Sequence, residues 1–113
     1  MKLLTVSSNA ELQKALGAGG KKRLVLFYSA WCPFCTAFMP AFEKEAAADP
    51  SRFVAACTDD AGDLEDLFSI DVVPTVLCFD GAKPSARLDG RLGRGLSAAE
   101  LSAFAAACLK EGE

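Results

Sequence analysis

Two cysteines, Cys32 and Cys35, are separated by two residues in the run W-C-P-F-C, a spacing that lets a small disulfide ring close and open again. The apolar run 23–28 before them predicts a buried strand, and residues 36–48 after them predict a helix. We therefore expect Cys32 at the mouth of that helix and Cys35 in its first turn. The unpaired backbone N–H groups of a helix start favour an anion, so this placement predicts a reactive thiolate.

A Cys-x-x-Cys pair can also be half of a zinc site, but such a site needs four ligands. The chain has no histidine, and Cys57, Cys78 and Cys108 lie singly on apolar segments without metal-ligand spacing. We expect no metal at the pair. Because free cysteine packs like a small hydrophobic residue, we expect these three to be inert in the core; a regulatory thiol, the alternative, would have to be exposed.

The composition is that of a globular protein, with 51% hydrophobic and 24% charged residues among 113, and predicts a single domain over residues 1–113. A net charge of −3 without a basic stripe disfavours nucleic-acid binding, and the basic run 21–23 is expected to be a solvated lead-in to a strand. No segment has the apolar length of a membrane span or a signal-peptide core. With the scattered cysteines, this predicts a cytoplasmic location and no membrane partner.

Hydrophobic periodicity and turn signals predict alternating strands and helices, followed by a hairpin and a last helix. Ser-x-x-Glu capping boxes at 8–11 and 97–100 open the first and last helices. Gly90, Gly93 and Gly95 lack the spacing and the Lys-Ser/Thr ending of a phosphate-binding loop, so we expect them to form a turn. The predicted elements are strand 3–6, helix 8–16, strand 23–28, helix 36–48, strand 53–58, helix 63–69, strand 75–79 and strand 86–91, then a helix from 97.

This order of elements resembles the thioredoxin family over nearly the whole chain. The motifs that carry the resemblance are W-C-x-x-C after the second strand, Pro40 in the next helix, V-P-T at 73–75, F-D-G at 79–81, and Gly93 before the last helix. The resemblance implies an α/β thioredoxin fold, a mixed central sheet of about five strands with about four helices on its two faces. It also implies a cis peptide bond before Pro74, packed against the disulfide.

The resemblance further implies a function, the reduction of disulfides in other proteins. Cys32 would attack the substrate disulfide and Cys35 would resolve the mixed disulfide. A flavin-containing thioredoxin reductase, drawing on a nicotinamide cofactor, would reduce the oxidised pair; the chain itself would bind no cofactor and act as a monomer. The backbone of Val73 would pair with an extended substrate segment. The other residues expected to contact substrate are Trp31, Pro33, Phe34, Val72, Pro74 and Gly93.

Three positions depart from the family pattern. The dipeptide between the cysteines is Pro33-Phe34 instead of Gly-Pro, and Leu26 replaces a buried aspartate. The lysine that normally faces that aspartate is also missing, and its place falls near Ala56. Proton transfer to and from Cys35 therefore lacks its usual carboxylate. Water or another acid, with Asp59 as a candidate, would have to serve.

Two alternatives remain open from the same residues. The Cys-Pro-aromatic-Cys pattern also resembles glutaredoxins, which use glutathione, although glutaredoxins begin almost at their motif strand, without the strand and helix found here first. A binding function is the second alternative, in which two chains share an iron–sulfur cluster through Cys32. The order of elements favours the thioredoxin interpretation over both.

Overall fold

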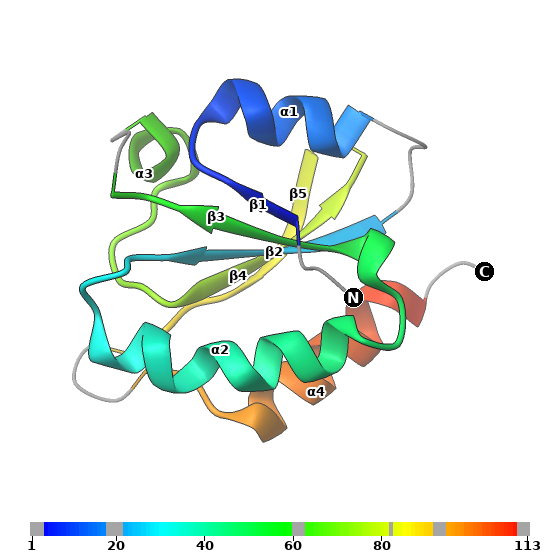
Figure 1. The fold of residues 1–113 in the computed structure, drawn as a ribbon. Helices are drawn as coiled ribbons and strands as arrows, with labels where there is room; N and C mark the ends of the chain where they lie inside the picture. Colours follow the sequence, from blue (N-terminus) through cyan, green and yellow to red (C-terminus); the bar gives the residue numbers. More distant parts are fainter. Residues whose placement is uncertain (1–3, 18–21, 60–62, 82, 92–94, 111–113) are drawn as a thin grey trace.

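The computed structural model describes residues 4–17, 22–59, 63–81, 83–91 and 95–110. Within them the chain forms a five-stranded mixed sheet and four α-helices, which confirms the predicted fold (Figure 1). No helix among the described residues is long and apolar enough to cross a membrane. The elements are β1 (Leu4–Val6), α1 (Asn9–Gly17), β2 (Lys22–Tyr28), α2 (Pro33–Ala46), a 3-10 turn (Pro50–Arg52), β3 (Phe53–Cys57), α3 (Asp63–Phe68), β4 (Thr75–Asp80), β5 (Lys83–Leu88) and α4 (Ala98–Lys110).

The strands lie in the order β1-β3-β2-β4-β5, with β2 at the centre. β3 runs parallel to β2, with Tyr28 opposite Cys57, whereas β4 runs antiparallel to it, with Phe27 opposite Thr75. The end of β2, the end of β3 and the start of β4 therefore meet at one edge of the sheet. The Cys-x-x-Cys pair follows β2 at this edge.

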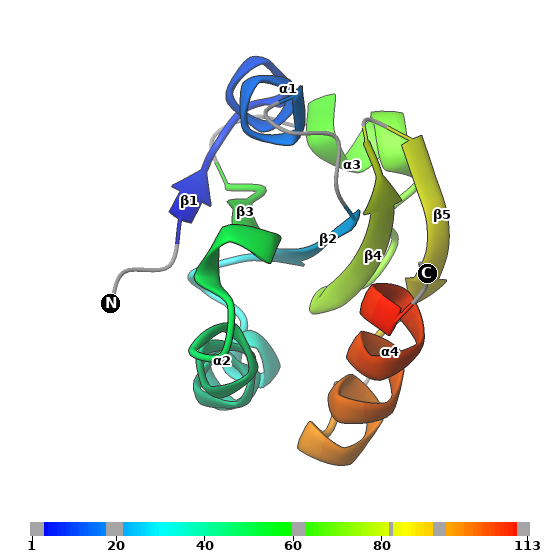
Figure 2. The ribbon, with the colours of Figure 1, turned by 90° about the vertical axis from the view of Figure 1, so that its right-hand side faces the viewer.

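The central strand is buried on both faces, since successive side chains of a strand point to opposite sides. Val25 and Phe27 pack in one apolar cluster with α1 and α3, and Leu24 and Leu26 pack in the other with α2 and α4. Figures 1 and 2 show the same arrangement, with one pair of helices on each side of the sheet. The two layers fix β2 firmly beneath the helix that carries the cysteines.

The hairpin differs from the sequence prediction in its second strand, which begins at Lys83 and not at 86. Lys83 already pairs with Asp80, so the ladder starts immediately after the turn. Pro84 is accommodated because β5 is an edge strand, where a missing N–H need not cost a ladder hydrogen bond. A register shift between Cys78 and Phe79 adjusts the pairing beside it.

The expectation that the basic run 21–23 is solvated is wrong for Arg23, which lies in β2 and is 5% exposed. Its guanidinium donates to the carbonyl of Leu16 at 3.1 Å and to that of Ser51 at 3.2 Å. A buried charge is tolerated when its donors are paired in this way. Arg23 thus ties the end of α1 to the turn before β3.

The expectation that Cys78 and Cys108 are inert free thiols is also wrong. They form a disulfide that joins β4 to α4, with their Cα atoms 5.9 Å apart. Both residues are buried, in the cluster between the sheet and α4. The pairing depends on how α4 packs across β4, a contact that a separation of 30 residues does not reveal in the sequence.

This disulfide should stabilise the fold, because it closes a long loop in the unfolded chain. For a sequence separation of 30, the loop-entropy relation gives about 3–4 kcal/mol. We expect the double variant Cys78→Ala/Cys108→Ala to lose about that much free energy of unfolding in urea. Cys57→Ala, which removes a cysteine outside any disulfide, is the control. Equal stability of the double variant and the unmodified protein would show that the cross-link does not constrain the unfolded chain.

Candidate functional site

The paired cysteines lie at the start of α2, as predicted. Cys32 is the N-cap residue, and its Sγ accepts the backbone N–H of Cys35 at 3.4 Å. Its carbonyl accepts the backbone N–H of Thr36 at 3.1 Å. Cys32 is half-buried, whereas Cys35 is 1% exposed. The sulfur of Cys32 is therefore accessible at the helix start, whereas the sulfur of Cys35 cannot be reached directly by substrates.

Cys35 is held in its protonated form by its surroundings. Burial raises the pKa of the Cys35 thiol to about 12, a hydrogen bond from the Ser29 backbone partly lowers it, and the neighbouring Cys32 and Asp59 raise it again. A hollow of about 420 Å³ borders Cys35. The hollow is lined by Tyr28, Ser29, Ala30, Cys35, Thr36, Met39, Pro40 and Glu43.

The segment before β4 faces Cys32. The Val73–Pro74 peptide bond is cis, as the resemblance implied, and the Cys32 thiol donates to the Val73 carbonyl across 3.6 Å. Pro74 is buried, while Val72 and Val73 are half-buried. Chain segments 41 residues apart therefore meet at the reactive sulfur.

The predicted aromatic residues lie beside this sulfur and are open to solvent. Trp31 is 88% exposed and Phe34 is 40% exposed, which is unusual for side chains of this size. Pro33 is also exposed. Six of the nine predicted site residues thus lie in the first turn of α2, just before it, or opposite Cys32. The six are Trp31, Cys32, Pro33, Phe34, Cys35 and Val73.

Gly93, expected to line the groove, lies outside the described residues. The structure instead places Gly90 against the cis bond: a Cβ on Gly90 would lie 2.2 Å from the Pro74 carbonyl oxygen. Gly95 has a positive φ of 75° and packs on Phe34, whose Cβ would be 3.0 Å from an added Cβ. Sequence reasoning treated both glycines only as parts of a turn. Their proximity to Pro74 and Phe34 depends on the tertiary course of the chain.

Position 26 carries no acid, because it is a leucine. Leu26 is fully buried in the cluster under α2. Its partner on β3 is Ala55; Ala56, expected to face it, packs in the cluster on the opposite face of the sheet. A carboxylate that does influence the pKa of Cys35 is that of Asp59. The sequence could name Asp59 as a candidate, but not its contacts.

Asp59 holds the connection between β2 and α2. Its carboxylate accepts the Ser29 hydroxyl at 2.6 Å and the Ala30 N–H at 2.9 Å, and these two bonds lower the pKa of Asp59. The Ser29 hydroxyl oxygen in turn accepts the Trp31 N–H at 3.2 Å. Because the Ser29 backbone also bonds to Cys35, one exposed carboxylate fixes the residues that surround both cysteines.

Cys57 adds a third thiol at the same edge. It lies opposite Tyr28 at the ends of the two parallel strands, and its side chain bonds to both Tyr28 and Asp59. Burial and this contact with Cys57 raise the pKa of the Tyr28 hydroxyl. Cys57 is therefore half-buried within a polar cluster and is not simply packed in the core.

Comparison with known proteins identifies the family. The family model described as Thioredoxin matches residues 3–105. This chain belongs to the thioredoxin family. Thioredoxin from Alicyclobacillus acidocaldarius is 33% identical over 85 residues, which cover 74% of this chain and 80% of that protein. The two cysteines placed together at a helix start fit this family.

Other relatives differ in length or are similar only in fold. Thioredoxin domain-containing protein 15 from Homo sapiens is 35% identical over 91 residues, but these cover 79% of this chain and 25% of that protein. The chain therefore spans about a quarter of that relative's length. The crystal structure of Chlamydomonas reinhardtii thioredoxin f2 superposes with a TM-score of 0.82 at 20% identity, covering 98% of this chain and 100% of that one. This similarity supports the thioredoxin fold.

Gly90→Ala tests the contact with Pro74. An added Cβ would meet the Pro74 carbonyl oxygen at 2.2 Å, so the backbone must move, and overpacking of this kind costs about 1–3 kcal/mol. We expect a lower urea midpoint and slower disulfide reduction. Gly17→Ala is the matched control, because nothing lies within 4 Å of its added Cβ. Identical behaviour of the two variants would contradict the close packing of Gly90.

The protonated state of Cys35 predicts a pH dependence of stability. An unfolded cysteine loses its proton near pH 8.5, whereas the folded pKa of Cys35 is about 12. Between these values the folded state binds the extra proton, so the free energy of unfolding of the reduced protein should fall as the pH rises, by at most about 1.4 kcal/mol per pH unit. Urea unfolding at pH 8 to 10, with Cys35→Ala as control, measures this slope. Equal slopes for both proteins would show that Cys35 titrates normally.

Proposed function

We propose that this protein reduces disulfide bonds in other proteins through a dithiol–disulfide cycle at Cys32 and Cys35. The observation that carries the proposal is the division between the two sulfurs. Cys32 is accessible at the helix start, and Cys35 is buried one turn further with a raised pKa. A nucleophile must reach its substrate, whereas a resolving thiol needs only to reach the nucleophile.

The cycle transfers two electrons from the thiols to the substrate. The Cys32 thiolate attacks one sulfur of the substrate disulfide and displaces the other as a thiolate, which leaves a mixed disulfide on Cys32. Cys35 then loses its proton and attacks the Cys32 sulfur. The Cys32–Cys35 disulfide forms, the substrate leaves as a dithiol, and the pair must be reduced before the next cycle.

The proton of Cys35 needs an acceptor, because Leu26 cannot act as one. Water in the hollow beside Cys35 is the acceptor we propose, since Cys35 is among the residues that line this hollow. Asp59 lies close enough to influence Cys35, but its carboxylate oxygens are already bonded to Ser29 and Ala30. We therefore assign Asp59 to holding the connection between β2 and α2.

The partners follow from the same proposal. Extended segments of disulfide-containing proteins would lie along Val73 and the exposed rings of Trp31 and Phe34. The family suggests a flavin-containing thioredoxin reductase, linked to a nicotinamide cofactor, as the source of electrons. Glutathione is the alternative reductant that the Cys-Pro-aromatic-Cys sequence leaves open.

The cytoplasmic location inferred from the sequence stays a prediction. The Cys78–Cys108 disulfide bears on it, because such bonds persist mainly in oxidising compartments. The pattern of cysteines therefore no longer favours a reducing compartment. Cell fractionation followed by an immunoblot for the protein would test the location directly.

The proposal predicts different behaviour for the two thiols. Cys32→Ser should abolish the reduction of insulin, because the attacking sulfur is lost. Cys35→Ser should instead accumulate covalent adducts with protein substrates, because the mixed disulfide cannot be resolved. Non-reducing gels and mass spectrometry measure the adducts. Equal trapping by both variants, or turnover by Cys32→Ser, would show that the roles are misassigned.

The same assay distinguishes the sources of electrons. Insulin reduction is measured with dithiothreitol, with thioredoxin reductase plus NADPH, and with glutathione plus glutathione reductase and NADPH. We expect turnover in the first two mixtures. Turnover in the glutathione mixture but not in the thioredoxin reductase mixture would favour the glutaredoxin-like activity. A dimer that absorbs visible light after anaerobic purification would favour the iron–sulfur protein.

A further inference from the structure

We propose that Arg87 is a positioning residue for protein substrates, which holds the segment 69–74 so that the Val73 backbone faces Cys32. Arg87 lies on the edge strand β5, and no motif in the sequence marks it. The proposal deepens the proposed function, on which it rests, because it concerns how the same site binds a protein chain.

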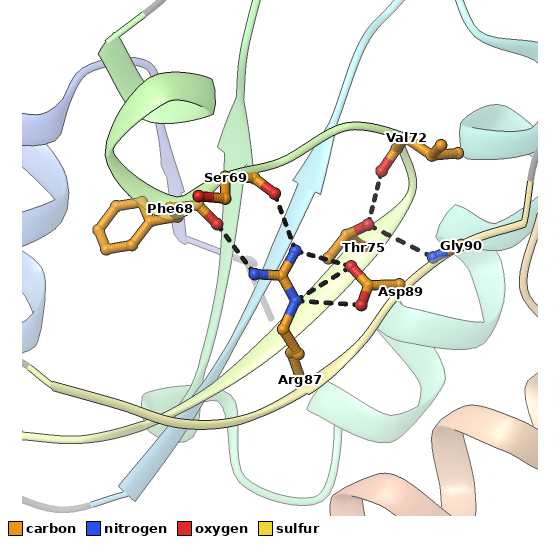
Figure 3. Close-up of polar contacts among 7 residues, drawn as sticks. All are labelled: Phe68, Ser69, Val72, Thr75, Arg87, Asp89 and Gly90. Atoms are coloured by element: carbon orange, nitrogen blue, oxygen red, sulfur yellow. Dashed lines mark hydrogen bonds and ion pairs between the residues drawn. The ribbon is translucent and has the colours of Figure 1, made fainter.

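Arg87 fixes the beginning of the segment. Its Nη1 donates to the Phe68 carbonyl at 3.0 Å, and its Nη2 donates to the Ser69 carbonyl at 3.0 Å (Figure 3). These carbonyls lie where α3 ends, and the last carbonyls of a helix have no partner within it. Ser69 turns the chain with a positive φ of 53°, so the direction in which the segment leaves α3 is set at this point.

Asp89 fixes the guanidinium itself. Its two carboxylate oxygens accept Nε at 3.1 Å each, and one of them also accepts Nη2 at 2.7 Å. The planar fork of arginine can bond to a carboxylate and to two carbonyls at once, whereas a lysine ammonium offers only a point charge. Asp89 therefore orients Arg87 toward α3, as Figure 3 shows.

The neighbouring Gly90 fixes the other end of the segment. Its N–H donates to the Thr75 hydroxyl oxygen at 3.4 Å, and that hydroxyl donates to the Val72 carbonyl (Figure 3). Gly90 also packs directly on Pro74. The chain from Arg87 to Gly90 thus holds the segment on both sides of Val73.

The contacts of Arg87 contribute little to the free energy of unfolding. Its ion pair with Asp89 is exposed, with side chains 37% and 54% accessible, and exposed pairs add little stability. α3 is held independently by apolar packing, since Leu64 is fully buried and Phe68 packs on the same cluster. Loss of Arg87 should therefore loosen the segment while the fold remains intact.

The test compares a protein disulfide with a small one. Insulin can pair with the Val73 backbone, whereas 5,5′-dithiobis(2-nitrobenzoate) has no peptide backbone and needs only Cys32. For Arg87→Ala we expect KM for insulin to rise about five- to tenfold with little change in kcat, and the rate with the small disulfide to stay the same. Arg87→Lys should recover only part of the loss. Arg52→Ala, at an arginine on the turn before β3 that pairs with Asp49, is the control.

Hydrogen exchange gives a second readout that does not require activity. Amides of residues 70–73 should exchange faster in Arg87→Ala, while those of β2 and β4 keep their protection. Unchanged exchange, an unchanged KM for insulin, or an equal loss with both substrates would overturn the proposal. If the unmodified protein reduces neither disulfide, the proposed function fails, and exchange alone still decides whether Arg87 holds the segment.

Discussion

The pairing of β2 with its two neighbours is the constraint on which the rest of the site depends. β3 lies parallel to β2 and β4 lies antiparallel to it, so two strand ends and one strand start share an edge. This edge receives the cysteine helix from β2, Asp59 from β3 and the cis-Pro74 segment from β4. A one-residue slip in the β2 register would turn Leu24 and Leu26 to the opposite face and would displace all three. Burial of β2 on both faces prevents such a slip.

The parts of the site outside regular structure are held by polar contacts. On one side, Asp59 bonds to the Ser29 hydroxyl and the Ala30 N–H. On the other side, Arg87 and Gly90 hold the segment around Val73. The Asp59 and Arg87 contacts lie near solvent, so each contributes little to global stability, whereas the Gly90 contact is buried. Together these contacts fix backbone groups that apolar packing does not reach. The core and the polar contacts therefore have separate roles, the first in folding and the second in geometry.

Apolar packing beneath the cysteines extends to position 26. Leu26 is fully buried where the family pattern has an acid, so the core avoids an unpaired carboxylate that would be costly to desolvate. The Cys78–Cys108 disulfide further strengthens the same layer by joining α4 to the sheet. In the proposed cycle, proton transfer from Cys35 is left to water. The buried layer is thus specialised for stability, and the chemistry is confined to one edge.

The sequence by itself determined the local features of this protein. Hydrophobic periodicity marked β2 and α2, the capping box at 97–100 marked the start of α4, and the W-C-x-x-C run placed the reactive thiols at a helix start. The thioredoxin resemblance added the cis bond before Pro74, which no local preference requires. These features depend on residues within a few positions of one another or on motifs that can be matched directly.

Only the tertiary structure decided which distant residues meet. The bond between Cys78 and Cys108, the packing of Gly90 on Pro74, the contact of Gly95 with Phe34 and the bonds from Arg87 to α3 all join segments whose separation is set by strand order and helix packing. Sequence patterns report the face on which a residue lies, because side chains alternate along a strand and recur along a helix. They do not report which partner lies across that face, because the partner is fixed by the packing of the whole chain.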